Sequence, residues 1–115
     1  MDIPTHMMKN AHLDGDAFLI EGNHVGVVLL HGFTATTAEV RLLADYLRGF
    51  GYSLAAPILP GHGTQPEELN KTNWIDWYEA AERAYLELRG KCRKVFMCGE
   101  SMGALLALLV ASRYA

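Results

Sequence analysis

The sequence predicts an α/β fold: a three-layer α/β/α arrangement in which helices cover both faces of a mostly parallel β-sheet. Two observations predict it. Residues 25–30 (VGVVLL) form an unbroken apolar run rich in β-branched side chains, which is typical of a strand buried on both faces. Segments with strand character also alternate along the chain with segments of helical periodicity. This alternation indicates β-α-β units and therefore parallel strands.

The first elements are expected to follow a polar lead-in. Residues 1–15 are predicted to be loosely ordered, and residues 16–115 are predicted to form the domain. An apolar run at 17–21 ends at a Gly-Asn pair, which is typical of a tight turn. We therefore expect residues 17–21 and 25–30 to be two strands joined by that turn.

The next segment carries the signals of a helix followed by a strand. Thr36 and Glu39 have the spacing of a capping box at a helix start. Apolar residues then repeat on one helical face: Val40, Leu43, Ala44 and Leu47. Gly49 or Gly51 is expected to end the helix, and strand signals resume at residues 52–56.

The second half of the chain repeats this alternation. Prolines and glycines between residues 57 and 66 predict an irregular segment that lasts until Thr72 or Asn73 caps a second helix. The residues of its expected buried stripe share helical spacing: Trp74, Trp77, Tyr78, Ala81, Ala84, Tyr85 and Leu88. A short buried strand at 94–98 and a helix at 102–114, apolar on almost every side, complete the predicted order.

The composition argues against several function classes. The chain has 115 residues, half of them apolar, with 10 Lys and Arg against 13 Asp and Glu and a net charge of −3. No five like charges are consecutive, so we expect no nucleic-acid partner. The longest apolar run, residues 104–111, is far shorter than the ~20 residues that cross a bilayer, and the start lacks a signal-peptide core. We expect a cytoplasmic protein without stable membrane insertion, in which Cys92 and Cys98 are free thiols.

The strongest functional signal is the motif Gly99-x-Ser101-x-Gly103, placed directly between a predicted strand and a predicted helix. A nucleophile elbow makes a sharp turn at such a place, and it needs glycines because a Cβ would collide with neighbouring elements. Ser101 would then stand at the positive end of the following helix, where a developing oxyanion is favoured. The plainer alternative is that Ser101 is a helix N-cap whose neighbouring glycines serve close packing.

A second signal is the loop that begins His31-Gly32-Phe33 directly after the long apolar strand. An acyl-transfer site needs two N–H donors that face the carbonyl oxygen as it becomes an oxyanion. We expect these donors to be the backbone N–H groups of Met102, next to the serine, and of Phe33. The alternative is a glycine-containing turn with a structural histidine.

Four motifs occur in a characteristic order along the chain. They are VVLLHGFT at 27–34, APILPGHG at 56–63, DW at 76–77 and GESMG at 99–103. Together they resemble the bacterial carboxylesterase and monoacylglycerol-lipase group of the α/β-hydrolase fold, from about residue 17 to the end. The resemblance implies hydrolysis of small-molecule carboxylic esters or monoacylglycerols with no metal or organic cofactor. It also implies that His31 shapes the oxyanion loop and that His62 braces the loop after its strand.

The family's catalytic triad is incomplete in these residues. In the family an Asp or Glu and then a His follow the serine, but the 14 residues after Ser101 contain none of these types. The family's sheet order also places the strand at 94–98 centrally, so here its edge is expected to be open and apolar. We expect the N-terminal part of a longer enzyme, with a missing C-terminal portion or a second chain completing the sheet. The alternative is a non-catalytic interaction module that pairs with a partner through this edge.

Overall fold

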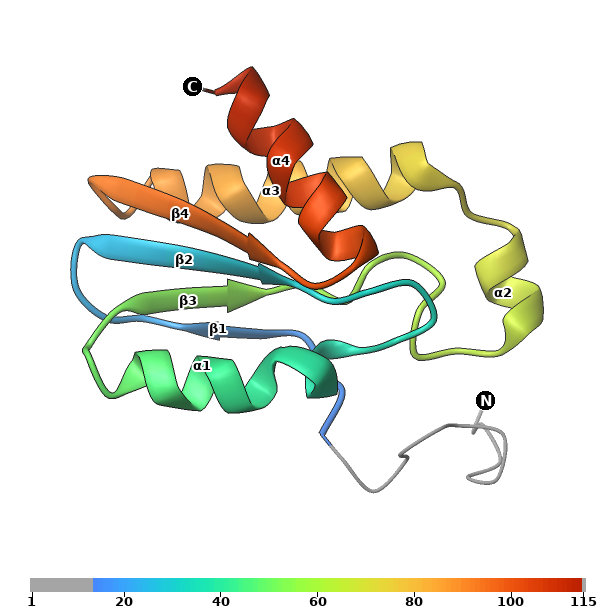
Figure 1. Cartoon of the computed structure of the whole chain (residues 1–115), viewed down its shortest axis with the longest axis horizontal. Helices are drawn as coiled ribbons and strands as arrows, with labels where there is room; N and C mark the ends of the chain where they lie inside the picture. Colours follow the sequence, from blue (N-terminus) through green and yellow to red (C-terminus); the bar gives the residue numbers. More distant parts are fainter. Residues whose placement is uncertain (1–13, 115) are drawn as a thin grey trace.

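A four-stranded sheet forms the centre of the molecule. The computed structural model describes residues 14–114, so residues 1–13 of the expected lead-in lie outside the described residues. The strands are β1 (Phe18–Ile20), β2 (Val25–Leu30), β3 (Ser53–Ala56) and β4 (Lys94–Gly99), in the order β1-β3-β2-β4 (Figure 1). β2 is parallel to both β3 and β4, and β1 is antiparallel to β3. The mostly parallel sheet is therefore confirmed.

Helices cover both faces of this sheet. The 3₁₀ turn η2 (Thr37–Val40) and helix α1 (Arg41–Arg48) lie on one face, and helices α3 (Trp74–Arg89) and α4 (Met102–Arg113) lie on the other (Figure 1). The short helix α2 (Pro66–Asn70) lies beyond the carboxyl ends of the parallel strands. This is the expected three-layer arrangement. Within residues 14–114 no helix is long and apolar enough to cross a membrane.

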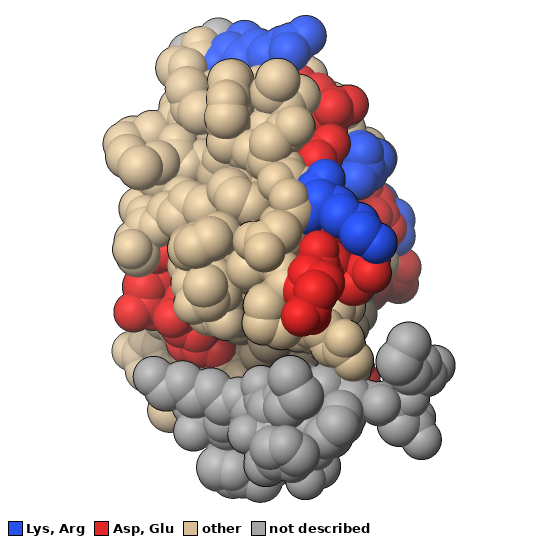
Figure 2. Space-filling view, turned by 90° about the vertical axis from the view of Figure 1, so that its right-hand side faces the viewer, with Lys and Arg blue, Asp and Glu red and all other residues tan. Residues whose placement is uncertain are grey.

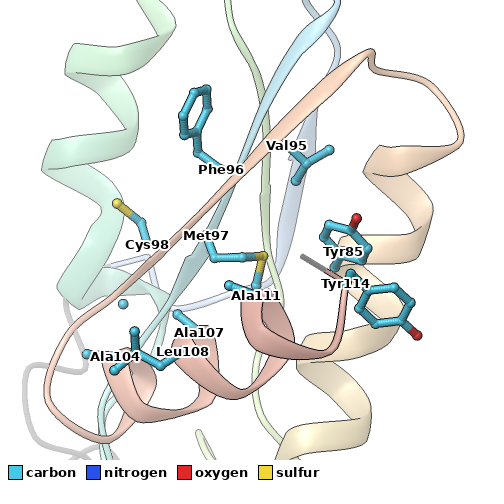
Figure 3. Close-up of a pocket in the computed structure, with 11 residues that line it drawn as sticks. Tyr85, Val95, Phe96, Met97, Cys98, Ala104, Ala107, Leu108, Ala111 and Tyr114 are labelled. Atoms are coloured by element: carbon cyan, nitrogen blue, oxygen red, sulfur yellow. The ribbon is translucent and has the colours of Figure 1, made fainter.

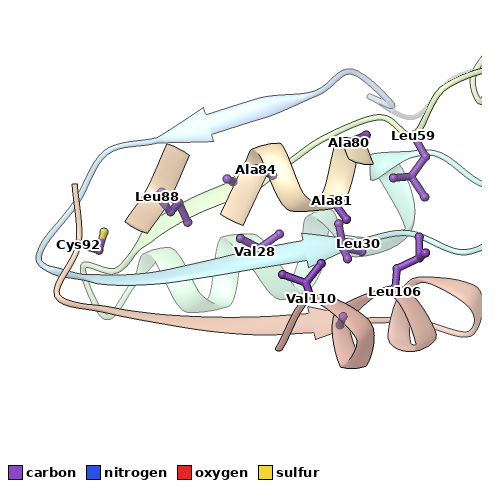
Figure 4. Packing of buried hydrophobic residues seen from close by; sticks show 12 residues of the cluster. Val28, Leu30, Leu59, Ala80, Ala81, Ala84, Leu88, Cys92, Leu106 and Val110 are labelled. Atoms are coloured by element: carbon purple, nitrogen blue, oxygen red, sulfur yellow. The ribbon is translucent and has the colours of Figure 1, made fainter. Parts of the chain in front are cut away.

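The side chains of β2 alternate between two hydrophobic cores. Val28 and Leu30 pack in the core beneath α3 and α4 (Figure 4), whereas Val27 and Leu29 pack in the core that contains Ala44 of α1. Successive side chains of a strand point to opposite faces, so burial on both faces requires an unbroken apolar run. Each fully buried leucine contributes about 2 kcal/mol to folding by its removal from water. β2 thus holds the layers together.

The two N-terminal strands form as expected, but they do not pair with each other, so the turn expected to join them does not close a hairpin. β3 lies between β1 and β2, because the chain returns from α1 to place β3 directly beside β2. The Gly22-Asn23 pair instead bridges to the start of β3. The Gly22 N–H donates to Ser53 Oγ at 2.8 Å, and the Asn23 N–H donates to the Gly51 carbonyl at 2.7 Å. These bonds replace the internal bond of a hairpin turn.

The segment after β3 is more regular than its proline content predicts. Helix α2 begins at Pro66, which is tolerated there because the first N–H groups of a helix have no intrahelical acceptor. Helix α3 begins where expected, since Asn73 and Asp76 form a complete capping box. Trp74, which was expected in the buried stripe, is 58% exposed because it stands in the first turn, beyond the edge of the core.

Strand β4 is less buried than its apolar sequence predicts. Its side chains alternate between exposed and half-buried, and Phe96 is 55% exposed. The reason is its place in the sheet: among the described residues β4 pairs with β2 alone and forms the edge. Both cysteines are free thiols as expected, although Cys98 is only half-buried on β4 and Cys92 is the buried one.

Candidate active site

The candidate site lies where the chain leaves two neighbouring strands in opposite directions. After β2 the chain turns towards α1 on one face of the sheet, and after β4 it turns towards α4 on the other (Figure 1). Loops that diverge in this way open a crevice at the carboxyl ends of parallel strands, which is where open α/β sheets bind ligands. The predicted residues His31, Gly32 and Phe33 follow β2, and Ser101 follows β4. The topology therefore brings the two signals of the sequence to one place.

The turn between β4 and α4, residues 99–103, is packed so closely that glycines are required at both ends. A Cβ added to Gly99 would lie 2.2 Å from the carbonyl carbon of Gly103. A Cβ added to Gly103 would lie 2.2 Å from the carbonyl oxygen of Leu30. The N–H of Glu100 donates to that same Leu30 oxygen at 3.0 Å and ties the turn to β2. We call residues 99–103 the elbow.

Ser101 occupies the tip of the elbow in a strained conformation. Its φ of +54° and ψ of −118° lie outside the regions that L-residues normally adopt, at a cost of about 1–3 kcal/mol. The two capping residues Thr36 and Asn73 have extended backbones instead, and their side chains accept helix N–H groups. The Ser101 side chain caps nothing. Ser101 thus holds the N-cap position of α4 without a capping hydrogen bond from its side chain, and this exposed residue stands at the positive end of the helix.

The loop after β2 packs directly against the elbow. A Cβ added to Gly32 would lie 3.5 Å from the Cβ of Ser101 and 3.4 Å from the Glu100 carbonyl oxygen. Met102 is the first residue of α4, and the first N–H groups of a helix lack intrahelical acceptors. Phe33 is half-exposed, and its ring contacts that of Trp77 with centroids 5.4 Å apart. Met102 thus follows the serine directly, and Phe33 follows Gly32, the residue that packs against the serine.

His31 is fully buried and uses both ring nitrogens within the protein. Nδ1 donates to the Gly32 carbonyl at 2.8 Å, and Nε2 accepts the Leu59 N–H at 3.1 Å, which assigns the neutral tautomer. Burial lowers the pKa of His31, because desolvation disfavours the charged ring and outweighs the hydrogen bond to Gly32. His31 therefore links the loop after β2 to the loop after β3, and it is not placed as a free base.

His62 is also buried, among aromatic rings. Its ring lies 5.8 Å from that of Phe33 and 5.6 Å from that of Trp77, both nearly edge-on. Nδ1 donates to the Pro60 carbonyl at 3.2 Å, and the Trp77 indole N–H donates to the same carbonyl at 3.0 Å. Burial lowers the pKa of His62, with desolvation as its largest cause. These contacts fix the loop after β3 beneath Phe33.

The sequence did not predict one contact at the site, the hydrogen bond between Glu39 and Gly32. Thr36 caps η2 as expected, accepting the Ala38 N–H at 3.2 Å, but Glu39 does not complete the capping box. Its Oε1 instead accepts the Gly32 N–H at 2.6 Å. The Thr-x-x-Glu spacing indicated that Glu39 would bind a backbone N–H near the helix start. It could not indicate which N–H, because that depends on how the preceding loop folds back.

The face of the molecule at the carboxyl ends of the parallel strands has an uncharged centre. Figure 2 shows this face, with acidic side chains on the left, acidic and basic side chains on the right, basic side chains at the top and no charged side chain in the middle of its described part. Residues 14–114 bring together no group of three or more His, Cys, Asp and Glu side chains that could hold a metal ion.

An apolar groove of about 680 Å³ runs between β4 and α4, beside the elbow. We call it the β4–α4 groove. Val95 and Met97 line it from the strand, Ala107 and Leu108 line it from the helix, and Tyr85 of α3 closes one side (Figure 3). Because Gly99 also lines it, the groove begins at the base of the elbow.

Comparison with known proteins places the chain in a family. A family model described as serine aminopeptidase, S33, matches residues 23–115. The chain is 38% identical over 99 residues to a thermostable monoacylglycerol lipase of Bacillus sp. (strain H-257), across 86% of this chain and 40% of that protein. It is 40% identical over 92 residues to a carboxylesterase of Bacillus subtilis (strain 168), across 79% of this chain and 37% of that protein. The chain therefore spans about 40% of the length of these curated relatives.

Solved structures agree with this assignment. One, described under two metagenome-derived lipolytic enzymes, LipS and LipT, superposes with a TM-score of 0.84 at 34% identity, over 87% of this chain and 41% of that chain. A hydrolase from Thermoplasma acidophilum, described as predicted and CIB-like, superposes with a TM-score of 0.58 at 25% identity, over 89% and 55% of the two chains. Fold, motif order and family model agree: the chain belongs to the serine aminopeptidase S33 family and has the fold of the N-terminal part of an α/β-hydrolase.

Proposed function

We propose that the protein containing this chain is a carboxylic ester hydrolase in which Ser101 is the nucleophile. The observation that carries the proposal is the strained backbone of Ser101 at the tip of the elbow, with its side chain engaged in no cap. Strain of this type persists only where the surrounding structure imposes it, and it clusters at functional sites. Gly99 and Gly103 on either side of the serine allow close backbone contacts of this turn that a Cβ would not permit.

The proposed reaction proceeds through an acyl-enzyme. Ser101 Oγ forms a bond to the ester carbonyl carbon while its proton passes to a histidine base, and the carbonyl π-electrons move to the oxygen. The N–H groups of Phe33 and Met102 hold that oxyanion. The oxyanion then collapses, the C–O bond to the alcohol breaks, and the alcohol takes the proton from the base. Water attacks the acyl-enzyme by the same steps and releases the acid and Ser101.

The base in this proposal comes from outside the chain. The residues after Ser101 contain no Asp, Glu or His, and both ring nitrogens of His31 are engaged with backbone groups. His62 is enclosed by the rings of His31, Phe33 and Trp77. We therefore assign the histidine and its orienting carboxylate to a C-terminal portion of the protein or to a second chain.

Carboxylic esters or monoacylglycerols are the proposed substrates. The two curated relatives are named as a monoacylglycerol lipase and a carboxylesterase, and the solved structure with the higher similarity is described as lipolytic. The uncharged centre of the face at the carboxyl ends of the strands supports a neutral, apolar acyl group better than a charged substrate (Figure 2). The aminopeptidase in the family's description makes peptides the competing substrate class.

An activity-based probe tests the nucleophile. In the native protein, together with any polypeptide that accompanies it, a fluorophosphonate is expected to label Ser101 and to stop hydrolysis of p-nitrophenyl esters. Ser101→Ala should abolish both labelling and hydrolysis. Ser112→Ala is the matched control, because Ser112 is also exposed on α4 but its hydroxyl donates to the Leu109 carbonyl. Unchanged hydrolysis in Ser101→Ala would rule out the proposal, and faster cleavage of peptide amides than of esters would move the substrate class to peptides.

The open edge of β4 favours a second candidate function. Among the described residues β4 pairs with β2 alone, so Val95, Phe96 and Met97 lie on an open strand edge, and such edges pair readily with other chains. In the ester-hydrolase proposal, further strands of the same protein or of a second chain cover this edge. In the alternative, the chain is an interaction module that binds a partner there. Failure of any fluorophosphonate to label the native protein would favour the module.

A further inference from the structure

We propose that Glu39 is a positioning residue that orients the oxyanion loop. It would act on the Phe33 N–H through the backbone of Gly32. The inference rests on the proposed function, because it assigns a role within the same site. It is carried by the contact between Glu39 Oε1 and the Gly32 N–H, which at 2.6 Å is short for an N–H···O bond.

Gly32 is the flexible link on which the orientation of the Phe33 N–H depends. Glycine has no Cβ to restrict its φ and ψ, so the two peptide planes on either side of it rotate freely unless other groups hold them. The plane of the Gly32–Phe33 peptide is held, because the Gly32 carbonyl accepts from His31 Nδ1 at 2.8 Å and from the Ala35 N–H at 3.2 Å. That carbonyl and the Phe33 N–H belong to one trans peptide and point in opposite directions.

Glu39 holds the plane of the His31–Gly32 peptide, which precedes Gly32. Its Oε1 accepts the N–H of the His31–Gly32 peptide at 2.6 Å. With both planes fixed, φ and ψ of Gly32 are fixed too, and the Phe33 N–H has one direction. Without Glu39, the peptide ahead of Gly32 is free to turn, and the loop loses one of its two constraints.

The position of Glu39 is itself well defined. It lies in η2, whose first turn is capped by Thr36, so its backbone is held next to the loop. A Cβ added to Gly32 would lie 3.2 Å from Glu39 Oε1 and 3.5 Å from the Cβ of Ser101. The carboxylate and the serine therefore approach the same Cα of Gly32.

The role depends on an acceptor oxygen at this position and not on a negative charge. A carboxylate near a developing oxyanion is electrostatically unfavourable, so its benefit must come from the hydrogen bond. Glu39→Gln keeps an acceptor oxygen at the same reach and removes the charge. Glu39→Asp keeps the charge but is one methylene shorter, so its oxygen falls short of the Gly32 N–H. Glu39→Ala removes both.

Ester-hydrolysis kinetics of the native protein test this role. Loss of a whole oxyanion donor costs ~100- to 1000-fold in kcat, and a misdirected donor should cost less, about 10-fold. We expect about that loss of kcat in Glu39→Ala and Glu39→Asp, with KM within about 2-fold, and kcat within about 3-fold of the unmodified protein in Glu39→Gln. A trifluoromethyl ketone, which binds the serine as an oxyanion, should lose affinity in parallel with kcat. Glu87→Ala, on the exposed face of α3, is the matched control and should change neither quantity.

The outcomes of these measurements support or overturn the positioning role of Glu39. If Glu39→Ala retains full kcat and full affinity for the ketone, or if Glu39→Gln loses as much as Glu39→Ala, the positioning role is wrong. A variant that raises KM alone, or that lowers kcat only by lowering the folded fraction seen by circular dichroism, also contradicts it. Failure of the proposed function is distinct, because then Ser101→Ala would leave hydrolysis intact and the Glu39 variants would have no serine-dependent rate to change.

Discussion

The elbow at the carboxyl end of β4 and the β4–α4 groove along its open side are built very differently. At its carboxyl end the elbow is completed by groups of the chain itself: Leu30 accepts the Glu100 N–H, and Gly103 lies against the backbone of Leu30. Along its open side, the β4–α4 groove leaves Leu108 67% exposed, and Phe96, which points to the other face of β4 (Figure 3), is 55% exposed. The site that would perform the chemistry is thus held by contacts among the described residues, whereas the surface beside it lacks a covering layer within them.

This difference shows which interactions each region depends on. The elbow depends on backbone contacts between β2, β4 and α4, all of which lie within the described residues. The groove depends on apolar area that only another layer or strand would remove from water. Substitutions in the two regions should therefore affect different properties, and the expected effects below run from the largest to the smallest.

The largest effect is expected from Gly103→Ala in the elbow. The new Cβ would lie 2.2 Å from the Leu30 carbonyl oxygen, so the backbone of β2 or α4 must move. We expect a loss of about 3 kcal/mol or more in the free energy of unfolding, measured by urea denaturation, because overpacking against backbone finds no rotamer to relieve it. Gly90→Ala is the matched control, since its nearest contacts would be ordinary ones at 3.6 Å and 3.7 Å. Equal stability of the two variants would contradict the close packing of the elbow.

The next largest effect is expected from Leu108→Ala, whose loss of stability tells whether the β4–α4 groove is covered or open in the native protein. In the native protein we expect Leu108→Ala to lower the free energy of unfolding by about 2 kcal/mol or more, because further strands would bury this side chain. Leu42→Ala, on the outer face of α1, replaces a leucine that is 85% exposed, and it should cost less than about 0.5 kcal/mol. If Leu108→Ala is as mild as Leu42→Ala in urea denaturation, the groove is open in the native protein.

The smallest effect is a dependence of stability on pH around the elbow. Burial lowers the pKa of His31 and of His62 below 6.5, so between the folded and unfolded pKa values the unfolded chain binds more protons. The stability that comes from keeping these rings neutral is therefore fully present above pH 6.5 and is lost as the pH falls below it. We expect the urea midpoint to fall from pH 7 to pH 5, and to fall less in His31→Asn. An equal fall in His31→Asn and the unmodified protein would contradict this assignment.

Most of the helices and strands could be predicted from local sequence patterns. Which strands pair with one another, and which side chains are left exposed, could not. The run at 25–30, the caps at Thr36 and Asn73 and the Gly-x-Ser-x-Gly turn each depend on residues close together in the chain. The pairing of β1 with β3 and the exposure of Phe96 depend on segments tens of residues away. Local propensity carries no information about which strand arrives beside which.

The candidate site likewise has features that local sequence predicts and contacts that depend on the folded sheet. The sequence by itself determined that a glycine-flanked serine follows a buried strand and that a His-Gly-Phe loop follows another, because strand, turn and helix signals are local. Only the tertiary structure decided that Gly32 contacts Ser101, that both ring nitrogens of His31 are hydrogen-bonded to backbone groups, and that Glu39 binds Gly32. Those contacts exist because β2 and β4 are parallel neighbours whose carboxyl ends meet at one edge, and that pairing is a property of the folded sheet.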